Sequence, residues 1–138
     1  MLLEQNRLQR LRDFDILFKE GVFVPGELVT AKIWCVAPDR YPKRGYTAID
    51  LKIGFIVSNK ISTSAVKRNR VKRQMREVVR LLLKDERLRP GFHVGIMAKG
   101  NILGQDYTAI EASILQVLRR GGIMRPPVKA DKATIYSA

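Results

Sequence analysis

Cationic side chains are concentrated in one segment of the chain. Eight Lys and Arg residues lie between Asp50 and Glu77, and no acidic residue lies among them. Guanidinium groups bind phosphate oxygens through two parallel hydrogen bonds, and ammonium groups bind them as point charges. The run Ser62-Thr63-Ser64 supplies N-cap chemistry for a helix predicted over residues 65–84. The segment therefore predicts a helix that presents phosphate-binding groups.

At about 100° per residue, this predicted helix separates into an apolar face and a basic face. The apolar face carries Val71, Met75, Val78, Val79 and Leu82. The basic face carries Asn69, Arg70, Lys72, Arg73, Arg76 and Arg80, with Lys67 and Arg68 nearer its borders. Like charges three or four residues apart repel by roughly 0.2–0.5 kcal/mol per pair, and the helix dipole disfavours cations near the N-terminus. Bound phosphates would remove this cost, so we interpret the basic face as a nucleic-acid contact. A merely solvated face is the alternative.

Aromatic side chains form a second candidate group. Phe14 and Phe18 lie one turn apart in a helix predicted over residues 8–20, and Trp34 lies in a predicted strand beside Lys32. Aromatic rings near cations stack single-stranded bases, at about 1–3 kcal/mol per base. Packing in the hydrophobic core is the alternative for each ring, and it is the more usual one for two phenylalanines at helical spacing.

The sequence does not predict a catalytic centre. His93, the only histidine, lies at the start of an apolar strand without an evident partner. Cys35, the only cysteine, lies in an apolar run, where we expect it to be buried in the core. A single cysteine allows neither an internal disulfide nor a cysteine metal cluster, and no nucleophile elbow or metal-ligand spacing occurs. We expect this chain alone to bind no metal or cofactor.

The composition indicates a folded protein with a polyanionic partner. The 138 residues are 46% hydrophobic and 28% charged, and 26 Lys and Arg against 13 Asp and Glu give a formal charge of +13. Such a surplus in a small domain points to nucleic acid or an anionic membrane surface. No apolar run approaches the roughly 20 residues of a membrane span, and the N-terminus does not read as a signal peptide. We expect a cytoplasmic protein with no membrane partner.

The predicted elements give an α+β fold. They are a helix over 8–20, strands over 22–24, 27–37 and about 47–58, a helix over 65–84, a strand over 92–98 and a helix over 105–120. The order α-β-β-β-α-β-α predicts a two-layer sandwich with a small, mostly antiparallel sheet of about four strands. One strand–helix–strand crossover would pair two strands in parallel. We expect one RNA-binding domain over residues 1–122 and a basic, flexible C-terminal tail over 123–138.

The basic segment resembles a known motif. Residues 67–77, Lys-Arg-Asn-Arg-Val-Lys-Arg-Gln-Met-Arg-Glu, are similar to the signature helix of the bacterial ribonuclease P protein component. Residues 53–60 resemble that family's strand and lysine-bearing turn, residues 7–21 its first helix, and residues 97–99 the end of its last strand. The resemblance extends over about residues 7–120.

This resemblance implies a subunit of the endoribonuclease that removes 5′ leaders from precursor tRNA. It implies that an RNA subunit carries out the hydrolysis with Mg²⁺ that this RNA mainly holds, and that the protein has no catalytic residue. It also implies that the strand–helix–strand crossover is left-handed. The residues implied to face the catalytic RNA are Lys60, Arg68, Asn69, Arg70, Lys72, Arg73 and Arg76. Those implied to line a cleft for the single-stranded leader of precursor tRNA are Phe14, Phe18, Lys32 and Lys99.

Two other functions remain open from the residues alone. A ribosomal or RNA-chaperone protein would share the charge and the α+β build but would lack the cleft. A DNA-binding protein could place the helix over 65–84 in a major groove. A helix-turn-helix is not evident, however, because a strand leads into this helix without a preceding short helix and tight turn. We therefore expect no DNA partner.

Overall fold

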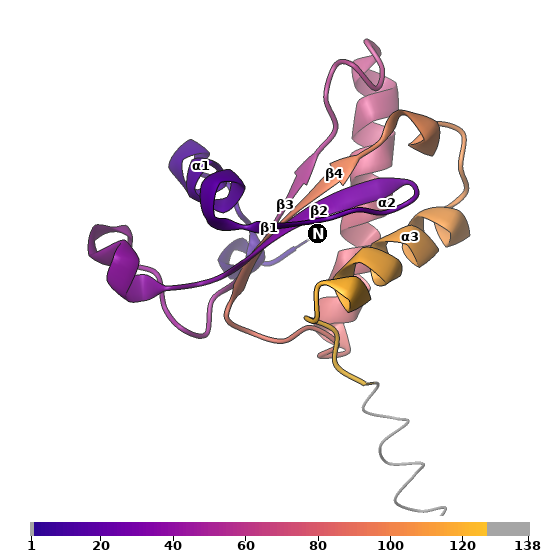
Figure 1. The fold of residues 1–138 in the computed structure, drawn as a ribbon. Coiled ribbons are helices and arrows are strands. Elements are labelled where there is room, and N and C mark those ends of the chain that lie inside the picture. The colour runs from indigo at the N-terminus through magenta and orange to yellow at the C-terminus, as the bar shows by residue number, and fades with distance from the viewer. Residues whose placement is uncertain (1, 127–138) are drawn as a thin grey trace, which may run out of the picture.

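The computed structural model describes residues 2–126 and confirms the predicted order of elements (Figure 1). The helices are α1 (Leu11–Glu20), α2 (Ala65–Lys84) and α3 (Tyr107–Arg120). The strands are β1 (Val22–Val24), β2 (Val29–Cys35), β3 (Leu51–Ile56) and β4 (Phe92–Ala98). Short 3₁₀ turns are η1 (Glu4–Asn6), η2 (Pro38–Arg40), η3 (Pro42–Arg44) and η4 (Gly100–Ile102). None of the helices in this part of the chain is long and apolar enough to cross a membrane.

The four strands form one sheet in the order β1-β2-β4-β3. The β1–β2 and β2–β4 pairs are antiparallel, and the β3–β4 pair is parallel. This arrangement confirms the predicted small, mostly antiparallel sheet with one parallel crossover. β4 lies inside the sheet although it is the last of these four strands in sequence.

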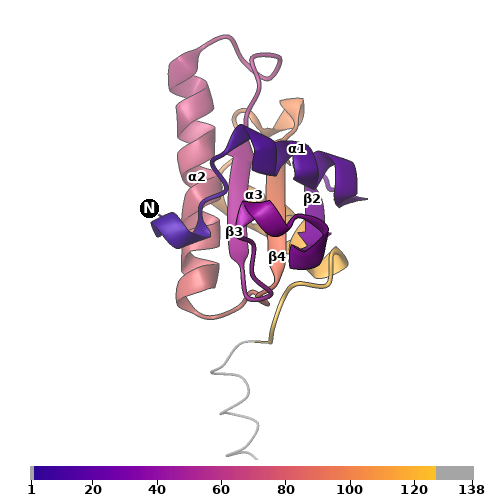
Figure 2. The ribbon, with the colours of Figure 1, turned by 90° about the vertical axis from the view of Figure 1, so that its left-hand side faces the viewer.

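The crossover from β3 through α2 to β4 is left-handed. Viewed from the side of α1, with β3 and β4 pointing upward, β4 lies to the right of β3 (Figure 2). α2 belongs to the layer on the far side of the sheet, where its apolar residues join the main core. About 98% of such connections are right-handed, so this handedness is unusual. It confirms what the family resemblance implies.

Helices lie on both faces of the sheet, so the expected two-layer arrangement is extended by α1. α2 and α3 pack on one face and α1 lies across the other (Figures 1 and 2). The main core contains the predicted apolar face of α2, which is Val71, Met75, Val78, Val79 and Leu82. Ser64 caps this helix as predicted, because its hydroxyl accepts a hydrogen bond from the backbone N–H of Lys67 at 3.3 Å.

α1 begins three residues later than predicted. Arg7 and Leu8 do not join the helix, because they pair with the edge of β3, where the Leu8 N–H donates to the Ile53 carbonyl at 3.1 Å. Leu11, although apolar, is 79% exposed at the start of α1. The residues that do pack under α1 form a second small core of Leu8, Ile16, Leu17, Trp34 and Val36.

Two further expectations are corrected. Cys35 is exposed rather than buried, because it is the last residue of β2 and lies outside both cores. Ile123, which we assigned to a flexible tail, is fully buried in the main core, and the Arg125 N–H donates to the Arg87 carbonyl. The folded domain therefore continues past residue 122. The rest of the predicted tail, residues 127–138, lies outside the described residues.

Candidate nucleic-acid interface

The predicted basic residues lie on three sides of α2. Asn69 and Arg73 are exposed on its outer side, beside Val66 and Arg76, in a shallow hollow. Arg70 lies with Lys67 on the side that faces η4. Lys72 and Arg76 are half-buried on the side that faces the edge of the sheet. The basic surface therefore wraps around the helix instead of forming a single flat stripe.

Not every cation of this region is equally available to a ligand. The guanidinium of Arg68 donates to the Ser62 carbonyl at 2.8 Å, so it also fixes the turn before α2. The Arg80 guanidinium binds both carboxylate oxygens of Glu77, at 2.6 and 3.0 Å, and this contact lowers the pKa of Glu77. Lys60 is exposed in the turn between β3 and α2. Arg70 and Arg73 are exposed, and neither takes part in such a contact among residues 2–126. They could therefore bind a phosphate without breaking a hydrogen bond of this kind.

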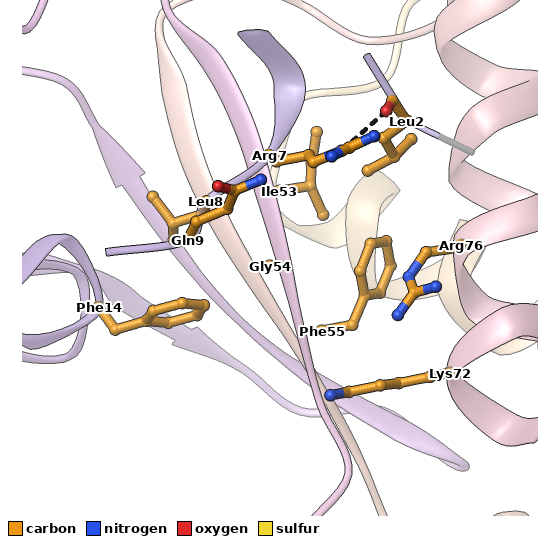
Figure 3. A pocket seen from close by; sticks show the side chains of 10 residues that line it. All are labelled: Leu2, Arg7, Leu8, Gln9, Phe14, Ile53, Gly54, Phe55, Lys72 and Arg76. Carbon is orange, nitrogen blue, oxygen red and sulfur yellow. Dashed lines mark hydrogen bonds between the residues drawn. The ribbon is translucent and has the colours of Figure 1, made fainter. Parts of the chain in front are cut away.

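A pocket of about 410 Å³ connects α2 with α1 across the edge of the sheet, and we call it the Phe14 pocket (Figure 3). Phe14 lies on one side of it, and Phe55, Lys72 and Arg76 lie on the other, with Gly54 between them. The remaining lining residues are Leu2, Arg7, Leu8, Gln9 and Ile53. The structure thus brings Phe14 of the predicted cleft together with Lys72 and Arg76 of the predicted RNA-binding helix.

The two phenylalanines of α1 form an aromatic pair, and Phe14, which is half-buried, also packs against the small core under the helix. Their ring centroids lie 6.4 Å apart with an angle of 26° between the ring planes, and the Phe18 side chain is 39% exposed. Trp34, in contrast, is 5% exposed and packs under α1, as the core alternative predicts. Phe14 and Phe18 can therefore offer ring faces to a ligand, whereas Trp34 cannot.

The two predicted lysines of the cleft lie at different distances from this pair. Lys32 lies on the α1 side of β2, and its ammonium approaches the Gly21 carbonyl at the end of α1 at 3.4 Å. Lys99 follows β4, four residues beyond Gly95, over which α1 packs, and so lies about 13 Å further along the strand. Its ammonium donates to the Gly26 carbonyl at 3.1 Å. The structure places Lys32 beside α1 and Lys99 beyond the end of β4, against the turn between β1 and β2.

Sequence reasoning missed several residues of this surface. Thr30, Ile56 and Met97 are opposite one another in the strand register and are half-buried, next to the row of strand residues that α1 covers. Phe23 pairs with Lys32, so both side chains share one face, and it is 54% exposed. The alternation of side chains along β1 and β2 could have indicated the position of Phe23. The row of Thr30, Ile56 and Met97 depends on strand order, which the sequence does not specify.

His93 is a buried residue of β4 and has a carboxylate partner, which the sequence did not indicate. Its side chain is fully buried between Trp34 and Tyr46, and its Nε2 lies 3.2 Å from a carboxylate oxygen of Asp50. Burial lowers the pKa of His93, although Asp50 acts in the opposite direction. Among residues 2–126, no three His, Cys, Asp or Glu side chains lie close enough to hold a metal ion.

Comparison with known proteins gives one consistent result. The family model described as Ribonuclease P matches residues 2–122. A ribonuclease P protein component from Synechococcus sp. is 29% identical over 124 residues, which cover 90% of this chain and 87% of that protein. The protein of the same name from Picosynechococcus sp. is 32% identical over 119 residues, which cover 86% of this chain and 89% of that protein.

Solved structures agree with the fold. The ribonuclease P protein of Staphylococcus aureus matches with a TM-score of 0.70 at 22% identity, covering 93% of this chain and 99% of that one. The protein from Thermotoga maritima matches with a TM-score of 0.64 at 24% identity, covering 83% of this chain and 96% of that one. These likenesses support the left-handed, four-stranded α+β fold described above.

Proposed function

Because this chain belongs to the ribonuclease P protein family, and so is a component of the endoribonuclease that processes tRNA, we propose that it binds two RNA segments through two adjoining surfaces. The basic surface of α2 contacts the RNA subunit, and the α1 side of the sheet contacts the single-stranded 5′ leader of precursor tRNA. The Phe14 pocket is the observation that carries this proposal, since it joins the two surfaces.

The contact with the RNA subunit rests on charge and exposure. Arg70 and Arg73 are exposed on α2, and Lys60 extends the same basic surface into the turn before the helix. Arg68, Asn69, Lys72 and Arg76 complete this proposed contact. Bidentate arginine–phosphate pairs hold a folded RNA without reading its sequence, and each displaced counterion makes the affinity depend on salt.

The leader contact rests on the aromatic pair. Phe14 and Phe18 offer partly exposed rings on which unpaired bases can stack, and such stacking tolerates any base. Lys32 lies beside them, and Lys72 and Arg76 face Phe14 across the Phe14 pocket. A strand whose bases stack on α1 would therefore carry its phosphates past cations on either side. Lys99 would meet the same strand further along the sheet.

The hydrolysis itself is assigned in this proposal to the RNA subunit, with the Mg²⁺ that it holds. Among the described residues of this chain, no three His, Cys, Asp or Glu side chains form a group that could hold a metal ion. The role of the protein is then to increase the affinity for substrate by binding RNA on both surfaces.

Reconstitution tests this proposal. The purified protein is added to a bacterial catalytic RNA at low magnesium, and removal of the 5′ leader from a precursor tRNA is followed. We expect cleavage only when both components are present. The RNA alone at high magnesium is the control for an active RNA subunit. Stimulation that is equal for substrates with and without an unpaired leader would contradict the leader contact while leaving the RNA-subunit contact intact.

A further inference from the structure

Residues 38–46, which connect β2 to β3, pack against α1 from the side opposite its aromatic pair, and we call them the strap. The strap comprises η2, Tyr41, η3, Gly45 and Tyr46. It reaches two carboxylates of α1, Asp13 and Glu20, which lie seven residues apart and therefore on one side of the helix. The strap is thus a second attachment of α1 to the domain, besides the small core under the helix.

Each carboxylate is held by one arginine and one tyrosine of the strap. The Arg44 guanidinium and the Tyr46 hydroxyl both donate to Asp13, each at 2.6 Å. The Arg40 guanidinium and the Tyr41 hydroxyl both donate to Glu20, at 3.0 and 3.1 Å. Charge-assisted hydrogen bonds of this kind fix both distance and direction. The two sets hold α1 near its first turn and at its last residue.

The Asp13 contact is the more buried of the two. The Asp13 side chain is only 9% exposed, and the Arg44 side chain is 25% exposed. Burial acts to raise the pKa of Asp13, but the hydrogen bonds from Tyr46 and Arg44 outweigh it and hold the pKa below its ordinary value. Asp13 is therefore a carboxylate anion in the folded protein near neutral pH, and the strap remains bonded to it.

The strap faces away from the surface that we assign to the leader. Phe14 and Phe18 lie roughly 100–160° around α1 from Asp13 and Glu20, at about 100° per residue. α1 has only 10 residues and no side-chain N-cap, so its own hydrogen bonds hold it weakly. Rotation of α1 about its axis would move the two rings over the sheet, and the strap opposes that rotation from the other side.

We propose that Asp13 and Glu20 are positioning residues, through which the strap fixes the rotation of α1 and so aims Phe14 and Phe18 at the single-stranded RNA. The proposal rests on the proposed function of those two rings. The strap, a connecting segment far from the basic helix, would then contribute to the discrimination between precursor and mature tRNA.

The test compares three single variants in the reconstituted ribonucleoprotein. Asp13→Asn keeps an acceptor oxygen but loses the charge, Glu20→Ala removes the second contact, and Asp15→Ala is the control, since Asp15 is exposed on the same helix. The measured quantity is the ratio of affinities for a precursor tRNA with an unpaired leader and for mature tRNA. Affinity of the protein for the RNA subunit is measured in parallel.

We expect Asp13→Asn and Glu20→Ala to lower the affinity ratio by up to about tenfold, the equivalent of one stacked base. The Asp15→Ala variant should keep the ratio, and all three should bind the RNA subunit equally. In a Phe14→Ala/Phe18→Ala background, Asp13→Asn should have no further effect on the ratio, because it acts through those rings.

Two results would overturn the inference. One would leave the proposed leader contact intact, and the other would contradict that contact as well. A lower melting temperature with an unchanged affinity ratio would show that the strap only stabilises the domain, and the leader contact would stand. An unchanged ratio in Phe14→Ala/Phe18→Ala itself would contradict the leader contact, and the positioning role would fail with it. Glu20→Ala keeps the test decisive if Asp13→Asn does not fold, because Glu20 lies at the end of α1.

Discussion

The ring of Phe14 occupies the space that a side chain at position 54 would need. A Cβ atom on Gly54 would lie 2.4 Å from Cζ and 2.6 Å from Cε1 of Phe14. Glycine at this position therefore allows α1 to bring an aromatic ring against the edge strand of the sheet. The same contact places Phe14 opposite Lys72 and Arg76 in the Phe14 pocket.

Replacement of Gly54 by alanine should displace the Phe14 ring. We expect a loss of stability of about 1–3 kcal/mol from overpacking, and a loss of leader discrimination similar to that of Phe14→Ala. Thermal unfolding and the precursor-to-mature affinity ratio measure the two effects. Gly100→Ala is the matched control, because nothing lies within 4 Å of a Cβ at that position. Equal behaviour of the two variants would show that Phe14 does not depend on this space.

Removal of exposed cations from α2 should weaken the RNA-subunit contact without unfolding the protein. The variant Arg70→Ala/Arg73→Ala loses two exposed arginines, and each lost phosphate contact reduces the slope of log affinity against log salt by about 0.9. Filter binding over a series of salt concentrations measures the slope. Arg12→Ala/Arg119→Ala removes the same charge from exposed positions on α1 and α3. A slope change of the same size in that control would point to net charge rather than to this helix.

Acid should release the strap through Asp13. The pKa of Asp13 is lower in the folded protein than its ordinary value of 3.8, so the unfolded chain binds more protons as the pH falls through this region. The stability that Asp13 contributes is therefore complete above about pH 4 and is lost as the pH falls through the folded pKa. Urea unfolding at pH 5, 4 and 3 should show a steeper loss for the natural sequence than for Asp13→Asn. Parallel losses would contradict this assignment.

Buried His93 should make stability fall at mildly acidic pH. Its pKa is lower in the folded protein than the ordinary 6.5, chiefly because of burial. Protonation thus favours the unfolded chain, and stability falls as the pH drops below about 6.5, by at most about 1.4 kcal/mol per pH unit. Between pH 7.5 and 5.5, the melting temperature should fall for the natural sequence and change less for His93→Gln, which keeps a donor for Asp50. If the melting temperature falls equally in the natural sequence and in His93→Gln, a group other than His93 is responsible for the pH dependence.

Local patterns predicted α2 well and α1 only in part. The bounds of α2 and its buried face follow from the spacing of Val71, Met75 and Leu82 and from the cap at Ser64, all within one segment. The start of α1 was wrong because Leu8 pairs with Ile53, which is distant in the chain. Periodicity cannot show such a contact, since the competing partner lies outside the segment that carries the pattern.

Prediction of the candidate site from the sequence would also have required knowledge of contacts between distant parts of the chain. The residue types of Phe14, Lys72 and Arg76 were identified from the sequence, but their meeting in one pocket depends on α1 and α2 lying on opposite faces of the sheet at its β3 edge. The contact between Asp13 and Arg44 spans 31 residues, and Arg44 belongs to none of the stretches that resemble the family. Such contacts follow from the way the strands are connected, which composition and spacing do not determine.

The position of β4 in the sheet affects how the protein folds. Among the strands of residues 2–126, β3 pairs only with β4, and β2 completes its pairing only with β4. During synthesis, β3 and the basic helix α2 leave the ribosome before residues 92–98, so the sheet cannot close until nearly three quarters of the chain has been made. Pairings this distant in sequence slow folding. The residues of α2 are therefore all synthesised before the sheet that supports them can form. Closure of the sheet by β4 then fixes the shape of the surface that we propose binds the RNA subunit.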